Sequence, residues 1–141
     1  MSGGVNVAGS SAIRLDRVWM TYHTREAETV ALADTSLEVA PQEFVAVVGP
    51  SGCGKSTLLN LIGGLDTPTS GSIALDGQPV TGASPMEWTR LRRELIGIVF
   101  QAFHLIPGLT VAENVALPIL LRGEQGRGLA GRIDEALQAV G

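Results

Sequence analysis

The sequence predicts an α/β fold whose sheet has a parallel component. Two continuous apolar runs, Phe44–Val48 and Ile96–Phe100, have the pattern of strands that are buried on both faces. Segments of alternating polarity precede the first run, and helical patterns follow both runs. This order of strands, then strand–loop–helix, then a further strand and helices is typical of an α/β domain. Hydrophobic residues make up 45% of the 141 residues, which is sufficient for one folded domain.

The segment before the first apolar run is predicted to form a β-hairpin. Ile13–Trp19 alternates between apolar and charged side chains, which indicates a strand with one face in solvent. Thr21–Thr29 is polar and is expected to connect this strand to a second one, Val30–Val39. Pro41-Gln42-Glu43 has the composition of a turn. Residues 1–11 lack the features of a signal peptide and are predicted to be a flexible tail.

A helix and a short strand are predicted after the first apolar run. The helix should begin at Gly54 or Lys55 and end at Gly63-Gly64, because glycine pairs interrupt helices. Ser72–Leu75 is predicted to be a strand that is closed by a turn at Asp76-Gly77.

The remaining sequence is predicted to be mainly helical. Ser84-Pro85-Met86-Glu87 combines a serine cap, a proline at the first helical position and a glutamate at the third, which is a helix-start signature. That helix should run to about Leu95. Val111–Arg122 and Leu129–Val140 also have helical patterns, and Pro118 should kink the former or lie near its boundary.

Charge and cysteine content argue against several classes of protein. The net charge of −4 disfavours sequence-independent nucleic-acid binding, which needs clustered Lys and Arg. The one basic cluster, Arg90, Arg92 and Arg93, is interpreted as a solvated helix face. The single cysteine, Cys53, cannot form an intrachain disulfide and fits a reducing compartment. The longest apolar run, near Val115–Leu121, is far shorter than the roughly 20 residues that cross a bilayer.

A phosphate-binding motif joins the first apolar run to the helix that follows. It matches G-x-x-x-x-G-K-S/T in full and consists of Gly49, Pro50, Ser51, Gly52, Cys53, Gly54, Lys55, Ser56 and Thr57. Glycines let successive backbone N–H groups point into one concavity, and the helix adds its positive dipole end. Lys55 would reach the β- and γ-phosphates, Ser56 would bind Mg²⁺, and Thr57 would lie near the α-phosphate. We therefore predict binding of ATP together with Mg²⁺.

The motif alone does not choose among kinases, GTPases and ATPases. A guanine-reading N-K-x-D motif is excluded because Lys55 is the only lysine, whereas a small-molecule kinase with the arginine cluster as its lid stays open. Gln101 directly follows Ile96–Phe100, and the carboxyl end of a parallel strand would face the same crevice as the phosphate loop. Its amide could ligate Mg²⁺ and orient water. The alternative is an ordinary polar residue after a strand.

Several stretches together resemble the nucleotide-binding domain of ABC transporters, and the resemblance extends from Ala12 to Gly141. They are Gly49–Thr57, Leu58-Leu59-Asn60-Leu61-Ile62-Gly63-Gly64-Leu65-Asp66, Pro68-Thr69-Ser70-Gly71-Ser72-Ile73 and Phe100-Gln101. Ile98–Pro107 and Glu113–Pro118 are most similar to the lipoprotein-release and macrolide-export subgroup. The resemblance implies a P-loop NTPase core of the ABC type with an antiparallel β subdomain in residues 12–101. Residues 102–141 would begin a helical subdomain.

The resemblance also implies roles for single residues. Tyr22, expected in the loop after the first strand, matches the aromatic residue that stacks on adenine, with Trp19 as its rival. Gln101 matches the catalytic-loop residue that touches metal and water and senses the membrane partner. Ala102–Leu121 matches the region that receives the transmembrane subunit, unless its apolar residues are ordinary core. Those apolar residues are Phe103, Leu105, Ile106 and Leu109.

Four parts of an ABC ATPase come later in the family than the stretches found here. They are the L-S-G-G-Q signature, a second acidic motif, a catalytic glutamate and a switch histidine. The resemblance therefore implies a truncated, N-terminal fragment that binds Mg-ATP and hydrolyses it poorly by itself. The full-length protein would dimerise head to tail with a second ATP-binding subunit and drive transmembrane subunits from the cytoplasmic face of the plasma membrane. The alternative is a non-catalytic nucleotide-binding protein that docks on transporter subunits.

Overall fold

The computed structural model describes residues 11–25, 27–124, 126 and 128–141. The predicted tail therefore lies outside the described residues, except for Ser11. The chain divides into two compact units, one that ends at Arg92 and one that runs from Arg93 to Gly141. Each unit is described by itself.

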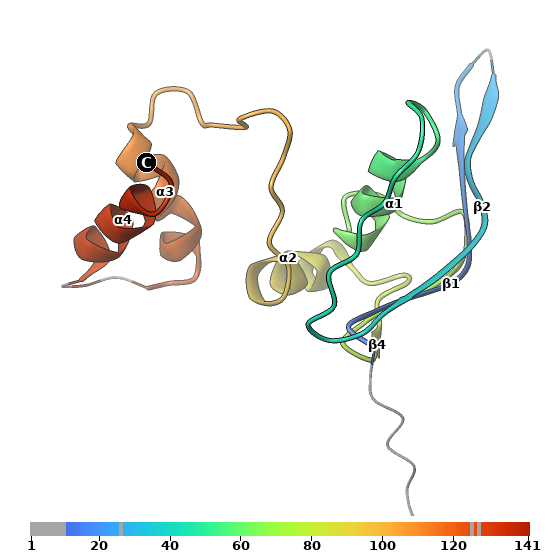
Figure 1. Ribbon diagram of the computed structural model, residues 1–141, viewed down its shortest axis with the longest axis horizontal. Coiled ribbons are helices and arrows are strands. Elements are labelled where there is room, and N and C mark those ends of the chain that lie inside the picture. The colour runs from blue at the N-terminus through green and yellow to red at the C-terminus, as the bar shows by residue number, and fades with distance from the viewer. Residues whose placement is uncertain (1–10, 26, 125, 127) are drawn as a thin grey trace, which may run out of the picture. The chain divides into compact units, whose positions relative to one another are not determined.

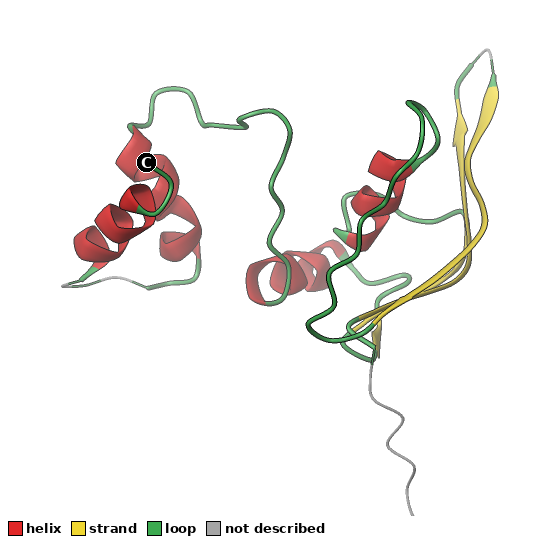
Figure 2. Ribbon diagram, viewed as in Figure 1, coloured by secondary structure: helices red, strands yellow, loops and turns green. Residues whose placement is uncertain are grey.

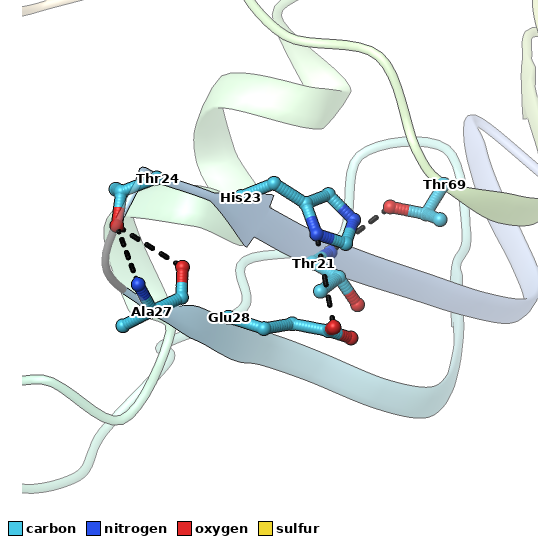
Figure 3. Close-up of polar contacts among 6 residues, drawn as sticks. All are labelled: Thr21, His23, Thr24, Ala27, Glu28 and Thr69. Atoms are coloured by element: carbon cyan, nitrogen blue, oxygen red, sulfur yellow. Dashed lines mark hydrogen bonds and ion pairs between the residues drawn. The ribbon is translucent and has the colours of Figure 1, made fainter.

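The first unit contains a four-stranded antiparallel sheet with the strand order β2-β1-β3-β4 (Figure 1). Both hairpin strands are longer than predicted, because most of the polar Thr21–Thr29 segment belongs to them. The turn between them is closed by Thr24, whose hydroxyl donates to the Ala27 carbonyl at 3.0 Å and accepts from the Ala27 amide (Figure 3). The strands are β1 (Ile13–His23), β2 (Glu28–Val39), β3 (Ser70–Leu75) and β4 (Gln78–Pro79).

The core of the first unit is formed by one face of this sheet together with the helix α1 (Lys55–Ile62). Leu15 of β1 lies opposite Leu37 of β2 and Ile73 of β3, so apolar side chains meet across neighbouring strands. The helix begins and ends as predicted, and it contributes Leu58 and the fully buried Leu61. The buried apolar side chains of the unit are Leu15, Val18, Met20, Leu32, Val39, Leu58, Leu61, Ile73, Leu75, Val80 and Leu91.

A second helix, α2 (Pro85–Glu94), starts with the predicted capping residues. The Ser84 hydroxyl accepts a hydrogen bond from the Glu87 amide at 3.3 Å, and the Glu87 carboxylate accepts one from the Ser84 amide at 2.7 Å. These reciprocal bonds satisfy backbone donors that the first turn of a helix leaves free.

The carboxyl end of α1 is held against α2 at Gly64. This glycine has a positive φ of 63°, and a Cβ atom at this position would overlap the ring of Trp88. Arg92 Nη1 donates to the Gly64 carbonyl at 2.7 Å, and its side chain is half-buried. Arg92 is therefore an exception to the predicted solvated arginine face. A carbonyl at the end of a helix is a favourable partner for a guanidinium group.

The two apolar runs that were predicted to be buried strands form neither a strand nor part of the core. Phe44–Val48 is drawn as a loop between β2 and α1 (Figure 2), and the exposed fractions of Phe44 and Val48 are 94% and 86%. Ile96–Phe100 is also irregular, and Val99 is fully exposed. The prediction of two strands was wrong because a strand needs hydrogen-bonded neighbours, and none pairs with these runs among the described residues.

The second unit contains the helices α3 (Val111–Leu121) and α4 (Leu129–Gln138), which pack together and bury Ala116 and Ile133. Pro118 lies inside α3, which continues past it to Leu121. Throughout the described residues, each helix is too short or too polar to cross a lipid bilayer.

Candidate phosphate-binding site

The predicted phosphate loop lies at the amino end of α1 and is mostly exposed. Gly52 and Gly54 both have positive φ, 81° and 91°, which gives the loop its tight curl. Gly54 is the N-cap residue of α1, and no side chain caps the helix at this end. Backbone N–H groups of the first turn are therefore available to an anion, and the positive end of the helix dipole favours one there.

Lys55 places its ammonium group over this loop. Its Nζ atom donates to the carbonyl oxygens of Gly49 at 2.9 Å and Pro50 at 2.7 Å, and it lies 3.7 Å from Cys53 Sγ. The only lysine of the chain is thus held beside the backbone groups that would bind phosphate. A positive side chain and free N–H donors in one place form a site for a polyphosphate anion.

The loop also packs closely against the sheet. A Cβ atom at Gly54 would lie 2.5 Å from the Ala31 carbonyl oxygen and 2.9 Å from Leu32 Cδ2, both in β2. A Cβ atom at Gly49 would lie 2.6 Å from Cys53 Sγ. The sequence motif explains Gly54 by the curl of the phosphate loop alone, whereas the structure adds close packing against β2, which no local pattern reveals.

Tyr22 lies beside the amino end of α1. The prediction placed it in the loop after the first strand, but it belongs to the strand β1 itself, which is longer than predicted. Its hydroxyl donates to Asp66 Oδ2 at 2.7 Å. The hydrogen bond with Asp66, followed by partial burial, raises the pKa of Tyr22, while a contact with the Thr57 side chain acts in the opposite direction. Tyr22 therefore contacts both the first turn of α1 and the segment that follows the same helix.

The segment after α1 also binds the backbone of β1. The Thr69 hydroxyl accepts from the Thr21 amide at 2.9 Å (Figure 3), and the Thr69 amide donates to the Trp19 carbonyl at 2.9 Å. Sequence reasoning did not single out Asp66 or Thr69 as functional residues. Tyr22 lies 44 positions before Asp66, and Thr21 lies 48 positions before Thr69, so no local pattern connects these pairs.

Of the two histidines, His23 lies at the exposed tip of the hairpin. Its Nδ1 atom is 3.8 Å from Glu28 Oε2 across the antiparallel pair (Figure 3). The two side chains are each 65% exposed, so the pair is worth little to stability. His23 is therefore a surface residue.

Gln101 belongs to the second unit and is exposed. Its position beside the phosphate loop therefore stays a prediction. Directly after it, the second unit has an apolar groove of about 650 Å³. The groove includes all the residues predicted to contact a membrane subunit, which are Phe103, Leu105, Ile106 and Leu109.

Asn114 of α3 fixes the loop that forms this groove. Its Oδ1 atom accepts from the Ile106 amide at 2.8 Å, and its Nδ2 group donates to the carbonyls of Leu109 at 3.2 Å and Thr110 at 3.0 Å. These bonds hold the backbone while the apolar side chains of the loop stay exposed, with Phe103 at 92%. The predicted contact residues are therefore not buried core within the described structure.

Comparison with known proteins gives matches over most of the chain. Residues 32–141 match the ABC transporter family. The ABC transporter ATP-binding protein YtrE of Bacillus subtilis is 46% identical over 117 residues, which cover 83% of this chain and 51% of that protein. The uncharacterized ABC transporter ATP-binding protein MJ1508 of Methanocaldococcus jannaschii is 43% identical over 92% of this chain and 58% of its own length. The chain thus spans about half the length of these curated relatives.

Solved structures of the ATP-binding cassette MJ0796 are also similar. A dimeric post-hydrolysis state bound to ADP and Pi has a TM-score of 0.84 and 41% identity, over 89% of this chain and 56% of that one. A second dimeric structure has a TM-score of 0.81 and 42% identity, over 89% and 54% of the respective chains. These matches confirm the predicted mixed α/β fold with its antiparallel β subdomain.

Proposed function

Since this chain belongs to the ABC transporter family, we propose that it is the amino-terminal part of an ATP-binding subunit that supplies energy to a transporter. The observation that carries the proposal is the position of Lys55 Nζ over the loop carbonyls at the uncapped start of α1. The similar structure of the cassette MJ0796, which is bound to ADP and Pi, supports this proposal.

The residues of the loop would divide the work of binding the triphosphate. Backbone N–H groups from Gly52 to Ser56 would surround the β-phosphate, and Lys55 would leave its carbonyl partners to bind the β- and γ-phosphates. Thr57 would lie near the α-phosphate. Tyr22, which is 37% exposed, would stack its ring on adenine. Trp19, which is 39% exposed and lies opposite Ser70 of β3, is the weaker candidate.

The loop also fits the metal that accompanies ATP. Mg²⁺ prefers oxygen ligands, and the hydroxyl of Ser56 is exposed in the first turn of α1. Ser56 and Gln101 would hold the ion, which would supply positive charge against the negative charge that develops on the phosphate. Gln101 would in addition orient water during hydrolysis.

Hydrolysis is proposed for the full-length protein and not for these residues alone. Phosphoryl transfer depends on positioning and on charge stabilisation, and the glutamate and second acid that the family uses lie outside the stretches matched here. The dimeric state of both similar cassettes supports a dimer with a second ATP-binding subunit. The head-to-tail arrangement of this dimer is proposed from the family resemblance.

The apolar groove of the second unit is proposed to receive a transmembrane subunit, within the range Ala102–Leu121. Its exposed apolar side chains and its fixed backbone suit a helix presented by a partner. We further propose a cytoplasmic location at the inner face of the plasma membrane. The resemblance of Ile98–Pro107 and Glu113–Pro118 to the lipoprotein-release and macrolide-export subgroup supports export or lipoprotein release as the transport function.

The substitution Lys55→Ala in the full-length protein tests the proposal. We expect the affinity for Mg-ATP to fall about ten- to hundredfold, because a charge-assisted contact with phosphate is lost. Calorimetric titration measures the affinity, and circular dichroism checks that the variant is folded. Arg90→Ala, which removes an exposed positive charge from α2, is the matched control and should bind normally. Unchanged ATP affinity in a folded Lys55→Ala protein would refute the proposal.

Phosphate release, measured together with the titrations, separates the proposal from its alternative. If the full-length protein binds Mg-ATP but does not release phosphate at any measurable rate with its transporter partners, the non-catalytic docking protein is favoured. Turnover that Lys55→Ala abolishes favours the energy-supplying ATPase.

A further inference from the structure

We propose that Asp66 is the positioning residue that holds the ring of Tyr22 in place for the nucleotide base. The proposal rests on the function proposed above, in which Tyr22 stacks on adenine. Asp66 would not touch the nucleotide itself. It would act through the tyrosine hydroxyl, at the end of the ring that points away from the backbone.

The first observation is the hydrogen bond between the two side chains. The Tyr22 hydroxyl donates to Asp66 Oδ2 at 2.7 Å, which is a short bond to a charged acceptor. Asp66 is itself fixed, because its Oδ1 atom accepts from the Thr67 amide at 2.9 Å. Both carboxylate oxygens are therefore engaged, and the ring is tied to a carboxylate of set orientation. The same bond raises the pKa of Tyr22, whose phenol is in any case protonated at neutral pH and can donate.

The second observation is that the segment around Asp66 bonds to the part of β1 that extends beyond its pairing with β3. The pairing of β1 with β3 ends at Trp19 opposite Ser70, so the part of β1 that carries Tyr22 has no β3 partner. Thr69 bonds the backbone of β1 at Trp19 and at Thr21, just before Tyr22. Asp66 then bonds the side chain of Tyr22. The segment 66–69 thus supports this end of β1 through its backbone and its aromatic ring.

This arrangement has a consequence for base binding. A half-exposed tyrosine ring can occupy several rotamers, and ordering it on binding lowers the affinity for the base. A ring that is already held by Asp66 avoids that cost. Asp66 lies just after α1, the helix that starts at the phosphate loop. It therefore connects the ring of Tyr22, on which the base would stack, to that helix. Phenylalanine would offer the same stacking face without this connection.

The test compares Mg-ATP with inorganic tripolyphosphate, which contains the phosphates without the base. In the full-length protein, Asp66→Ala should weaken Mg-ATP about three- to tenfold, the size of one net hydrogen bond, and leave tripolyphosphate affinity unchanged. Tyr22→Phe, which keeps the ring but removes the hydroxyl, should have the same effect. The double variant should bind no worse than either single variant, because both remove one interaction. Glu38→Ala, an exposed carboxylate on β2, is the control for loss of charge and should bind both ligands normally.

Tyr22→Ala distinguishes failure of this inference from failure of the function on which it rests. We expect it to weaken Mg-ATP at least about fivefold, since base stacking is worth roughly 1–3 kcal/mol, and to spare tripolyphosphate. If it does so while Asp66→Ala leaves Mg-ATP affinity unchanged, the positioning role of Asp66 is refuted and the stacking role stands. Equal losses of both ligands in Asp66→Ala would show a general structural role and refute it too. If Tyr22→Ala affects neither ligand, stacking by Tyr22 is refuted together with this inference.

Discussion

At the scale of single residues, Gly54 satisfies two demands at once. It has a left-handed backbone conformation with a φ of 91°, and its Cα atom lies so close to β2 that a side chain has no room. The phosphate loop is thereby pressed against the sheet at the point where α1 begins. A residue that was predicted from its motif alone turns out to join the loop to the core.

We predict that Gly54→Ala both destabilises the full-length protein and weakens its binding of Mg-ATP. The left-handed conformation costs a non-glycine residue about 1–2 kcal/mol. The added methyl group would also meet the Ala31 carbonyl oxygen at 2.5 Å, so the loop or the strand must move. Thermal unfolding and calorimetric titration measure the two effects.

Gly82→Ala is the matched control for Gly54→Ala. Gly82 has a similar φ of 80°, but nothing lies within 4 Å of its added Cβ atom. It should therefore show only the cost of the backbone conformation and should bind Mg-ATP normally. Equal loss of stability in the two variants would show that crowding against β2 is unimportant.

The residues of the site were predictable to the extent that their pattern is local. Gly49 to Thr57 form a contiguous motif, and the structure gives these residues a common loop with Lys55 over it. Asp66 could not be connected with Tyr22, because 44 positions separate them and only the fold brings them together. The role of Gln101 stays a prediction for the same reason, since it depends on how distant parts of the chain assemble.

At the scale of secondary structure, the four helices of the described residues were predicted closely, because the contacts that form a helix lie within a few residues of one another. The α3 helix shows the reason. The Thr110 hydroxyl accepts from the Glu113 amide at 3.3 Å, and the Glu113 carboxylate accepts from the Thr110 amide at 2.7 Å. Both partners lie within four consecutive residues, so the sequence contains the whole interaction. The predictions of strands at Phe44–Val48 and Ile96–Phe100 failed, because a strand depends on partner strands from distant parts of the sequence.

We predict that Thr110→Ala loosens the first turn of α3 and makes its stability less sensitive to acid. Loss of a threonine cap costs about 1 kcal/mol, which hydrogen exchange of the α3 amides in the full-length protein would detect. The Thr110 backbone amide, and after it the Thr110 hydroxyl, hold the pKa of Glu113 below its usual range. Thr110→Ala removes only the hydroxyl, so the acid response should be reduced in part. A carboxyl group with a lowered folded-state pKa adds stability above its unfolded pKa of about 4.3 and loses it as the pH falls through the folded-state value.

This prediction is checked by comparing how the protection of the α3 amides depends on pH in the wild-type protein and in the variants. In the wild-type protein the protection of α3 should decline from about pH 4 downwards, whereas in Thr110→Ala it should be lower at pH 7 and decline less. Thr89→Ala changes a threonine in the middle of α2 whose hydroxyl only donates to the Pro85 carbonyl, and it should leave α3 unaffected. A full acid response in Thr110→Ala would contradict the capping interpretation.

At the scale of the whole molecule, the exposed apolar runs are the main feature. Phe44, Val48 and Val99 are 86% to 100% exposed, although their pattern is that of a sheet interior. The chain spans about half the length of its curated relatives, and most apolar side chains of the two runs are exposed among the described residues. Such surfaces favour association between chains.

We predict that the 141-residue chain, purified by itself, aggregates and hydrolyses ATP at close to the background rate. Light scattering and phosphate release measure the two properties. Phe44→Ser with Val99→Ser should reduce the aggregation without restoring hydrolysis, because these changes remove apolar surface and supply no catalytic group. A sharp, reversible thermal transition of the 141-residue chain, or turnover like that of the full-length protein, would count against this prediction.

The contact between Trp88 and Gly64 gives the protein a built-in optical reporter. The indole ring of Trp88 lies against Gly64, which follows the end of α1 and precedes Asp66 by two positions. Trp19 is the only other tryptophan of the sequence. Indole emission shifts with the polarity of its surroundings, so a displacement of α1 would change the fluorescence of Trp88 without any attached dye. In a protein with Trp19→Phe, that signal would report movements of α1, the helix that connects the phosphate loop with Asp66 and the ring of Tyr22, in real time and at micromolar concentration.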